Sequence, residues 1–169
     1  QNSIESDLVL TSGEQVTIGL LSAALKNSNV KSIPLLGWQV PIITDSNHEK
    51  AKILNISNIR INKYFESNDV IVLAGFQGIN IDGKITSLGR GGSDTTAVAI
   101  ASSVNAERCD IYTDVDGVYT TDPNIDKNAK KISKISYEEM LEMASTGSKV
   151  LHTRSVELAM KNNLTLQVL

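Results

Sequence analysis

The chain has 169 residues, with 16 lysines and arginines against 19 aspartates and glutamates, and a formal net charge of −3. This length fits one domain, since domains usually contain about 100–200 residues. Charged residues make up 21% of the chain and aromatic residues 4%. This balance argues against a disordered acidic tail and against a nucleic-acid-binding protein that uses a basic face or stacked aromatic side chains.

Cysteine content and hydropathy exclude further classes. The single cysteine, Cys109, permits neither an internal disulfide nor a thiolate metal site, and its burial in a core strand is expected. The longest uninterrupted apolar run, residues 70–74, is too short to cross a bilayer. The first residues contain neither the basic nor the apolar region of a signal peptide. We therefore expect a cytoplasmic protein that binds no membrane.

The first half of the chain alternates between helical and extended patterns. Apolar residues at helical spacing predict a helix from Gly13, with Glu14 in its first turn. Three short strands and a second helix are then expected, over residues 30–36, 39–44, 52–56 and 59–67.

The β-branched run at 70–74 predicts a strand covered on both faces, as in a parallel sheet. Residues 79–81 and 84–88, joined by Asp82-Gly83, predict a hairpin. After Gly92 the pattern predicts a helix and then a strand over 108–113. Two helices over 137–144 and 151–161 and a last strand over 165–169 follow. The expected fold is a three-layer α/β/α sandwich with a mostly parallel sheet and a β-hairpin insertion.

A glycine cluster, Gly89 to Asp94, lies between a predicted strand and a predicted helix. Glycines allow close approach of a ligand to the backbone, and the unpaired N–H groups of a helix start favour an anion. Arg90 adds a forked donor for a carboxylate or phosphate, and Ser93 is the expected N-cap. The segment matches neither a P-loop nor the dinucleotide fingerprint. The residues themselves indicate an anion site at a helix start.

Together with its neighbours, this cluster resembles a known family. Four further segments take part in the resemblance, in the same order along the chain. The cluster lies within the segment 88–97, and the four further segments are 75–78, 112–123, 138–140 and 147–152. They are similar to the signature motifs of the aspartate kinases, within the amino-acid kinase family, and the similarity runs from about Gly13 to the C-terminus.

The resemblance implies ATP-dependent phosphorylation of the β-carboxylate of L-aspartate, the first step toward lysine, threonine and methionine. A carboxylate is already ionised at pH 7, so the reaction needs no general base. Phosphoryl transfer then depends mainly on positioning and charge stabilisation. The implied cofactor is ATP with Mg²⁺ held mainly by its phosphates, and the sequence contains no metal-ligand cluster.

The resemblance also implies roles for substrate-binding residues. Arg90 corresponds to the arginine that binds the α-carboxylate of aspartate, and Glu14 to the acidic residue that meets its ammonium group. The positions that line the substrate pocket are Gly91, Gly92, Ser93 and Asp94. Asp94 would orient the catalytic lysine.

That lysine is Lys149, which corresponds to the family residue that reaches the ATP phosphates. Asn124 stands where several relatives carry a basic nucleotide contact. The full set of expected ATP-binding residues is Thr113, Asp114, Tyr119, Asn124, Lys149 and Val150. His48 and His152 are interpreted as surface or supporting residues rather than ligands.

Two features of the family are absent from this sequence: an initial strand that runs into Lys-Phe-Gly-Gly, and the C-terminal ACT regulatory domains. We therefore expect residues 1–169 to be a partial catalytic domain with little kinase activity by itself, from a protein that forms homo-oligomers. Two alternatives remain open. One is a sibling amino-acid kinase that acts on another carboxylate, and the other is a non-catalytic remnant that retains ligand binding.

Overall fold

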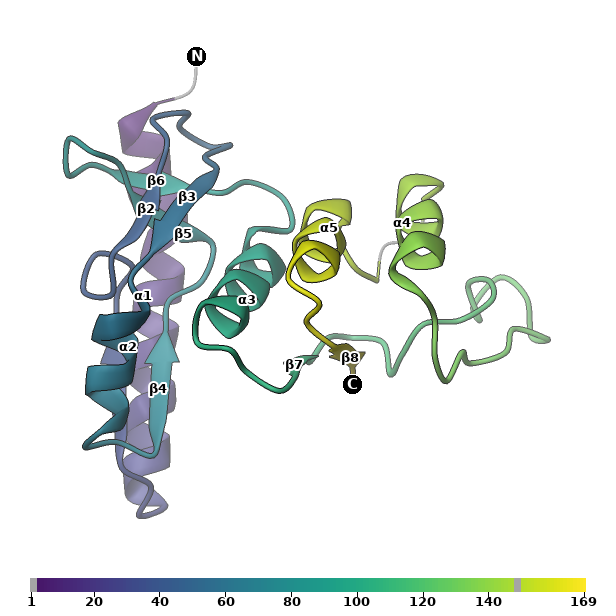
Figure 1. Ribbon diagram of the computed structural model, residues 1–169, viewed down its shortest axis with the longest axis horizontal. Coiled ribbons are helices and arrows are strands. Elements are labelled where there is room, and N and C mark those ends of the chain that lie inside the picture. The colour runs from purple at the N-terminus through teal and green to yellow at the C-terminus, as the bar shows by residue number, and fades with distance from the viewer. Residues whose placement is uncertain (1–2, 148–149) are drawn as a thin grey trace. The chain divides into compact units, whose positions relative to one another are not determined.

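The computed structural model describes residues 3–147 and 150–169. It divides into two compact units, Gln1–Thr96 and Ala97–Leu169, each of which is described by itself. Figure 1 gives the labels of the helices and strands.

Helix α1, Ile4–Asn27, opens the first unit. Its N-cap is Ser3, whose hydroxyl accepts the N–H of Ser6 at 3.0 Å, and two acidic residues in the first turn complement the helix dipole. The prediction that the helix begins at Gly13 is therefore wrong, and Glu14 lies in the middle of the helix. An interior glycine costs only about 1 kcal/mol, which the well-capped 24-residue helix tolerates.

Helix α1 is long and apolar enough to cross a membrane by length and composition, a criterion that core helices of soluble proteins also meet. Uninterrupted apolar runs in the sequence do not reveal this helix, because polar residues are spaced along it. The side chain of one of them, Asp7, is completely buried among polar groups of the first unit. The N-terminal part of α1 therefore packs against protein.

The strands of the first unit form two sheets. Strands β1, Ser32–Leu35, and β4, Val70–Leu73, pair in parallel, as expected for a β-branched run. The second sheet has the order β3-β2-β5-β6, in which β2 and β5 are parallel. Its strands are Ile42–Thr44 (β2), Ile53–Ile56 (β3), Gln77–Ile79 (β5) and Ile85–Ser87 (β6). Helix α2, Asn58–Phe65, follows β3.

The predicted hairpin is present. Strands β5 and β6 are antiparallel, and the Asn80 side chain accepts the N–H groups of Asp82 and Lys84 across the turn. Gly83 has a φ of +75°, a conformation that glycine adopts without strain. The hairpin forms one side of the four-stranded sheet, and a single residue, Leu88, separates the end of β6 from the glycine cluster.

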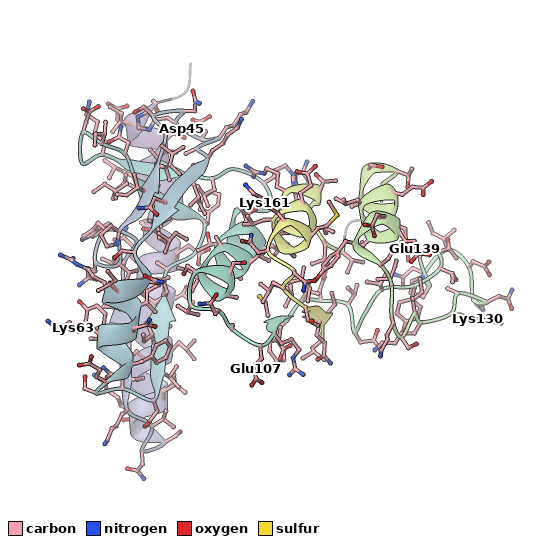
Figure 2. All side chains as sticks on the ribbon, in the orientation of Figure 1. Asp45, Lys63, Glu107, Lys130, Glu139 and Lys161 are labelled. Atoms are coloured by element: carbon pink, nitrogen blue, oxygen red, sulfur yellow. The ribbon has the colours of Figure 1, made fainter. Side chains whose placement is uncertain are left out.

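The second unit contains most of α3, Gly92–Ser103, with β7, Cys109–Ile111, and the helices α4, Tyr137–Ser145, and α5, Thr153–Lys161. The last strand, β8, Leu166–Val168, pairs in parallel with β7. Figure 2 shows that Glu107, Glu139 and Lys161 of this unit project from the surface, and each is exposed. Cys109 is buried in β7, as expected.

Candidate functional site

The glycine cluster forms a tight turn between β6 and α3. Gly89 has a φ of +70°, and a Cβ atom at this position would lie 2.6 Å from the carbonyl oxygen of Glu49. A Cβ atom on Gly92 would lie 2.8 Å from the Phe76 ring. The backbone therefore approaches its neighbours so closely that both positions require glycine.

Helix α3 begins at Gly92, so Ser93 is its second residue and the prediction of Ser93 as the N-cap is wrong. The carbonyl oxygen of Gly91 accepts both the N–H and the hydroxyl of Thr95, at 3.0 and 2.7 Å. The turn and its hydrogen bonds thus start the helix at Gly92, two residues before the Asp94 start that Ser93 as the N-cap would give. The exposed Ser93 side chain lies in the first turn of the helix.

A pocket of about 400 Å³ opens at this helix start, entirely within the first unit. Four residues of the glycine cluster that were predicted to bind substrate, Arg90 to Ser93, line this pocket. The other lining residues come from the cluster itself, from α1, from β6 and from two loops. Its lining consists of Leu10, Glu49, Phe76, Ser87, Gly89, Arg90, Gly91, Gly92 and Ser93.

The pocket offers both signs of charge, Arg90 and Glu49, beside the N-terminus of α3. The first N–H groups of a helix have no partner within the helix and attract anions. Among the described residues, Glu14 and Asp94 lie outside this lining and are half-buried. The structure therefore brings together four of the six expected substrate contacts.

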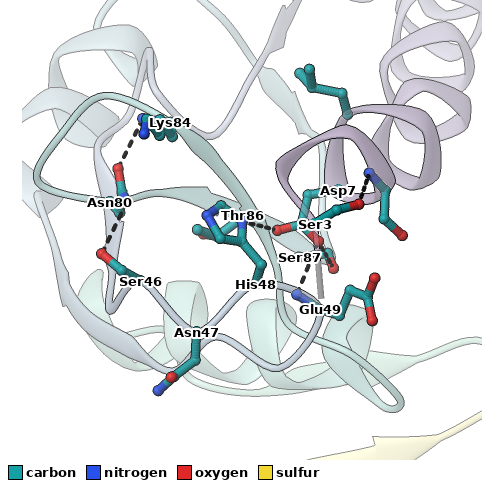
Figure 3. A network of polar contacts seen from close by, with 12 residues as sticks. Ser3, Asp7, Ser46, Asn47, His48, Glu49, Asn80, Lys84, Thr86 and Ser87 are labelled. Carbon is teal, nitrogen blue, oxygen red and sulfur yellow. Dashed lines mark hydrogen bonds and ion pairs between the residues drawn. The ribbon is translucent and has the colours of Figure 1, made fainter. Parts of the chain in front are cut away.

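One wall of the pocket rests on a buried polar network that sequence reasoning missed (Figure 3). The carboxylate of Asp7, on α1, accepts hydrogen bonds from the ring nitrogen Nδ1 of His48 at 2.6 Å and from the backbone N–H of Glu49 at 3.0 Å. It also accepts the hydroxyl of Ser87 at 2.6 Å. The signal in the sequence was an aspartate directly before the apolar run 8–10, where a solvated carboxylate is poorly placed.

The expected nucleotide contacts lie in the second unit. Thr113 and Asp114 are exposed and follow the carboxyl end of β7, the end at which open α/β sheets bind ligands. The Thr113 hydroxyl donates to Asp114 Oδ1 at 3.1 Å. Val150 is half-buried and packs against the apolar core of this unit.

Tyr119 belongs to a small exposed cluster. Its hydroxyl donates to Asp116 at 3.0 Å, and the same carboxylate receives Lys131 Nζ at 3.4 Å. The hydrogen bond from Tyr119, and after it the hydrogen bond from Lys131, lowers the pKa of Asp116. The hydrogen bond to Asp116 raises the pKa of Tyr119. Asn124 donates its backbone N–H to Asp122 at 2.8 Å. Lys149 lies outside the described residues.

Within residues 3–147 and 150–169, no group of three or more histidine, cysteine, aspartate or glutamate side chains is arranged to hold a metal ion.

Comparison with known proteins extends these observations. The family model described as the amino acid kinase family matches residues 1–169. An aspartokinase of Rickettsia felis is 52% identical over 165 residues, which are 98% of this chain and 41% of that protein. An aspartate kinase of Pseudomonas putida is 54% identical over 165 residues, 98% of this chain and 40% of that protein. The chain thus spans about two fifths of the length of these relatives.

A solved structure is similar over the same extent. The structure of E. coli aspartokinase III in complex with aspartate and ADP, in the R-state, is similar over 98% of this chain and 38% of the E. coli chain. Its TM-score is 0.90 at 32% sequence identity. The mixed α/β architecture with parallel strands is therefore that of the aspartokinase structures.

Proposed function

The chain belongs to the amino acid kinase family, and from this premise we propose that it serves the ATP-dependent phosphorylation of the β-carboxylate of L-aspartate. The observation that carries this proposal is the pocket at the start of α3, where Arg90 and Glu49 flank a glycine turn. The relatives named aspartokinase and aspartate kinase, at 52% and 54% identity, support the choice of substrate.

The pocket suits an amino-acid substrate with two carboxylates. The guanidinium of Arg90 offers a planar fork for the α-carboxylate, and the N–H groups at the start of α3 stabilise negative charge nearby. The β-carboxylate is ionised at neutral pH and attacks the terminal phosphorus of ATP directly, so the chain needs to position it rather than deprotonate it. Glu14 remains our proposed contact for the substrate ammonium group, and Asp94 for orienting Lys149.

ATP is assigned to the second unit, at Thr113, Asp114, Tyr119, Asn124, Lys149 and Val150. The exposed loop after β7 provides hydroxyl and carboxylate groups suited to a nucleoside. Mg²⁺ is proposed to arrive with the nucleotide and to be held mainly by its phosphates. It would neutralise charge on the phosphates as the β-carboxylate attacks.

We also propose that the protein acts in the cytoplasm as a homo-oligomer. Helix α1 exposes large apolar side chains outside the pocket lining that a partner would cover: Leu8, Val9, Val16, Leu20 and Leu21. Analytical ultracentrifugation over a range of concentrations tests self-association. A single sedimentation coefficient of the monomer would contradict it.

The substrate is tested by placing residues 1–169 in the corresponding part of the Pseudomonas putida aspartate kinase and measuring aspartyl hydroxamate formation. We expect ATP-dependent turnover of L-aspartate, and a roughly 10- to 100-fold rise in KM for L-aspartate in Arg90→Ala, because a charge-assisted hydrogen bond to the substrate is lost. Arg60→Ala is the matched control, since Arg60 is an exposed arginine of α2 outside the pocket lining.

Two outcomes would contradict the assignment. Preferential turnover of L-glutamate would favour the sibling-kinase alternative. Binding of L-aspartate and ATP by the chimera without any turnover would favour a non-catalytic remnant.

A further inference from the structure

We propose that Asp7 is a positioning residue for the substrate pocket, acting through His48, Glu49 and Ser87. The inference rests on the proposed function, because it takes the pocket at the start of α3 as the site of the amino-acid substrate. It concerns residues that the family motifs of the sequence do not include.

Asp7 is the one carboxylate among the described residues whose side chain is fully buried, at 0% exposure. Oδ1 accepts the Glu49 N–H and the Ser87 hydroxyl, and Oδ2 accepts the His48 ring nitrogen. These donors come from a loop and from β6, whereas Asp7 belongs to α1. Since a buried carboxylate is stable only when its hydrogen bonds are satisfied, the three segments are held at a fixed separation.

Two of the three donors belong to residues that line the pocket, Glu49 and Ser87. Leu10, one helical turn after Asp7, lines it as well. Asp7 therefore lies directly behind the wall formed by α1, β6 and the loop, as Figure 3 shows for Asp7, Glu49 and Ser87.

Glu49 itself has a φ of +64°, a left-handed conformation that is uncommon for residues other than glycine and asparagine. The hydrogen bond from its N–H to Asp7 supports this conformation. Its carbonyl oxygen in turn packs against Gly89, the first residue of the turn that carries Arg90. A path of direct contacts thus connects Asp7, Glu49 and Gly89, and ends at the proposed substrate-binding arginine.

The same loop contains a matched control. Asp45 accepts the N–H groups of Asn47 at 3.2 Å and of Lys52 at 3.1 Å, together with the Asn47 side chain. Like Asp7, it is a carboxylate with three hydrogen bonds, but its donors lie outside the pocket lining. Asp45→Asn therefore reports the cost of loosening the loop alone.

The first measurement is the KM for L-aspartate of the chimera described above. We expect Asp7→Asn to raise KM at least about tenfold, because a displacement of 1 Å in a positioned site costs up to about 100-fold. Asp45→Asn should change KM less than about twofold. His48→Gln, which keeps a side-chain N–H donor, should retain most of the affinity that His48→Ala loses.

The second measurement needs no substrate: amide hydrogen exchange of the 169-residue chain. Asp7→Asn should speed exchange at Glu49 and at the Gly92 amide, which donates to Gly89, more than Asp45→Asn does. If Asp7→Asn does not fold, the comparison of His48→Gln with His48→Ala in both measurements decides the question.

The outcomes separate the two proposals. A parent chimera without turnover of L-aspartate refutes the proposed function, while the exchange measurement still decides whether Asp7 positions the pocket wall. An active parent in which Asp7→Asn and Asp45→Asn give the same KM and the same exchange pattern overturns the positioning role.

Discussion

The two units of the chain have interiors of different chemistry. Buried polar side chains of the first unit are Asp7, Thr11, Ser22, Ser32, Thr44, Gln77, Asn80, Thr86, Ser87 and Thr96. This unit also buries apolar side chains, namely Leu35, Val40, Ile42, Ala51, Ile61 and Leu88, besides a small cluster of Ile18, Val72 and Ala74. The second unit has a cluster of ten buried residues, nearly all apolar, contributed by α3, β7, α4, α5 and the segments between them. Among the described residues of this unit, Ser155 is the one buried polar side chain.

This difference matches the roles that we propose for the two units. Apolar packing is non-directional, so it stabilises a unit without requiring a particular partner atom for each buried group. A hydrogen-bonded interior fixes donors and acceptors at defined separations, but it loses much stability when one partner is removed. The proposed substrate pocket lies in the unit with the polar interior, where its wall is held by hydrogen bonds.

The largest expected effect tests the apolar interior. Met140 of α4 is 4% exposed within the cluster of the second unit, and Met140→Ala should lower the free energy of unfolding by about 2–5 kcal/mol. The loss combines buried apolar surface with a cavity that neighbouring helices fill incompletely. Urea denaturation followed by circular dichroism measures it.

Met160→Ala of α5 is the control, because this methionine is 41% exposed. It should change the free energy of unfolding by less than about 0.5 kcal/mol. Equal losses for the two variants would mean that burial in the second unit does not determine its stability, and would remove the contrast between the units.

A smaller effect tests the polar interior. The hydroxyls of Thr44 and Thr86 lie 2.5 Å apart between β2 and β6, and both side chains are buried. Thr86→Val keeps the shape but leaves the Thr44 hydroxyl without this partner, which should cost about 1–3 kcal/mol.

Replacing both threonines sharpens the test. The double variant Thr44→Val/Thr86→Val removes both polar groups, and should recover most of the stability that Thr86→Val loses. If the double variant loses about twice as much free energy of unfolding as Thr86→Val, the two hydroxyls contribute independently and do not form a coupled pair. Urea denaturation of the three proteins gives the comparison.

Local signals in the sequence predicted most of the elements. The β-branched run predicted strand β4, and Asp82-Gly83 predicted the hairpin turn, because both signals lie in neighbouring residues. The start of α1 was misplaced because Gly13 was interpreted as a boundary, whereas the capping hydroxyl of Ser3 begins the helix two and a half turns earlier. Capping is also local, so the serine was a signal that could have been used.

The candidate site was predictable only in part, because only some of its residues are neighbours in the sequence. The residues from Gly89 to Ser93 are contiguous, and their composition indicates a turn before a helix. Asp7 and its partners His48 and Ser87 are 41 and 80 positions apart in the chain. No local pattern specifies such contacts, because they exist only once α1, the loop and β6 have packed together.

The smallest expected effect compares a similar hydrogen bond in the two units. Glu139 of α4 accepts the N–H of Ser136 at 2.9 Å, as Asp7 accepts that of Glu49, but Glu139 is exposed. The hydrogen bonds with Ser136 lower the pKa of Glu139. Its stabilising contribution is therefore present above the pKa that glutamate has in the unfolded chain, and it is lost as the pH falls through the folded-state value.

Glu139→Gln should accordingly lower the melting temperature slightly at pH 7, by less than Thr86→Val does, and the difference from the parent chain should vanish at acidic pH. Thermal unfolding at a series of pH values measures it. Glu138→Gln removes a charge from the same helical turn and leaves the Ser136–Glu139 pair intact, so it accounts for the helix dipole. An identical pH dependence for the two variants would show that the dipole alone is responsible. If Glu139→Gln lowers the melting temperature as much as Thr86→Val does, exposure does not weaken a polar contact here. The distinction between a buried polar interior and a polar surface would then fail.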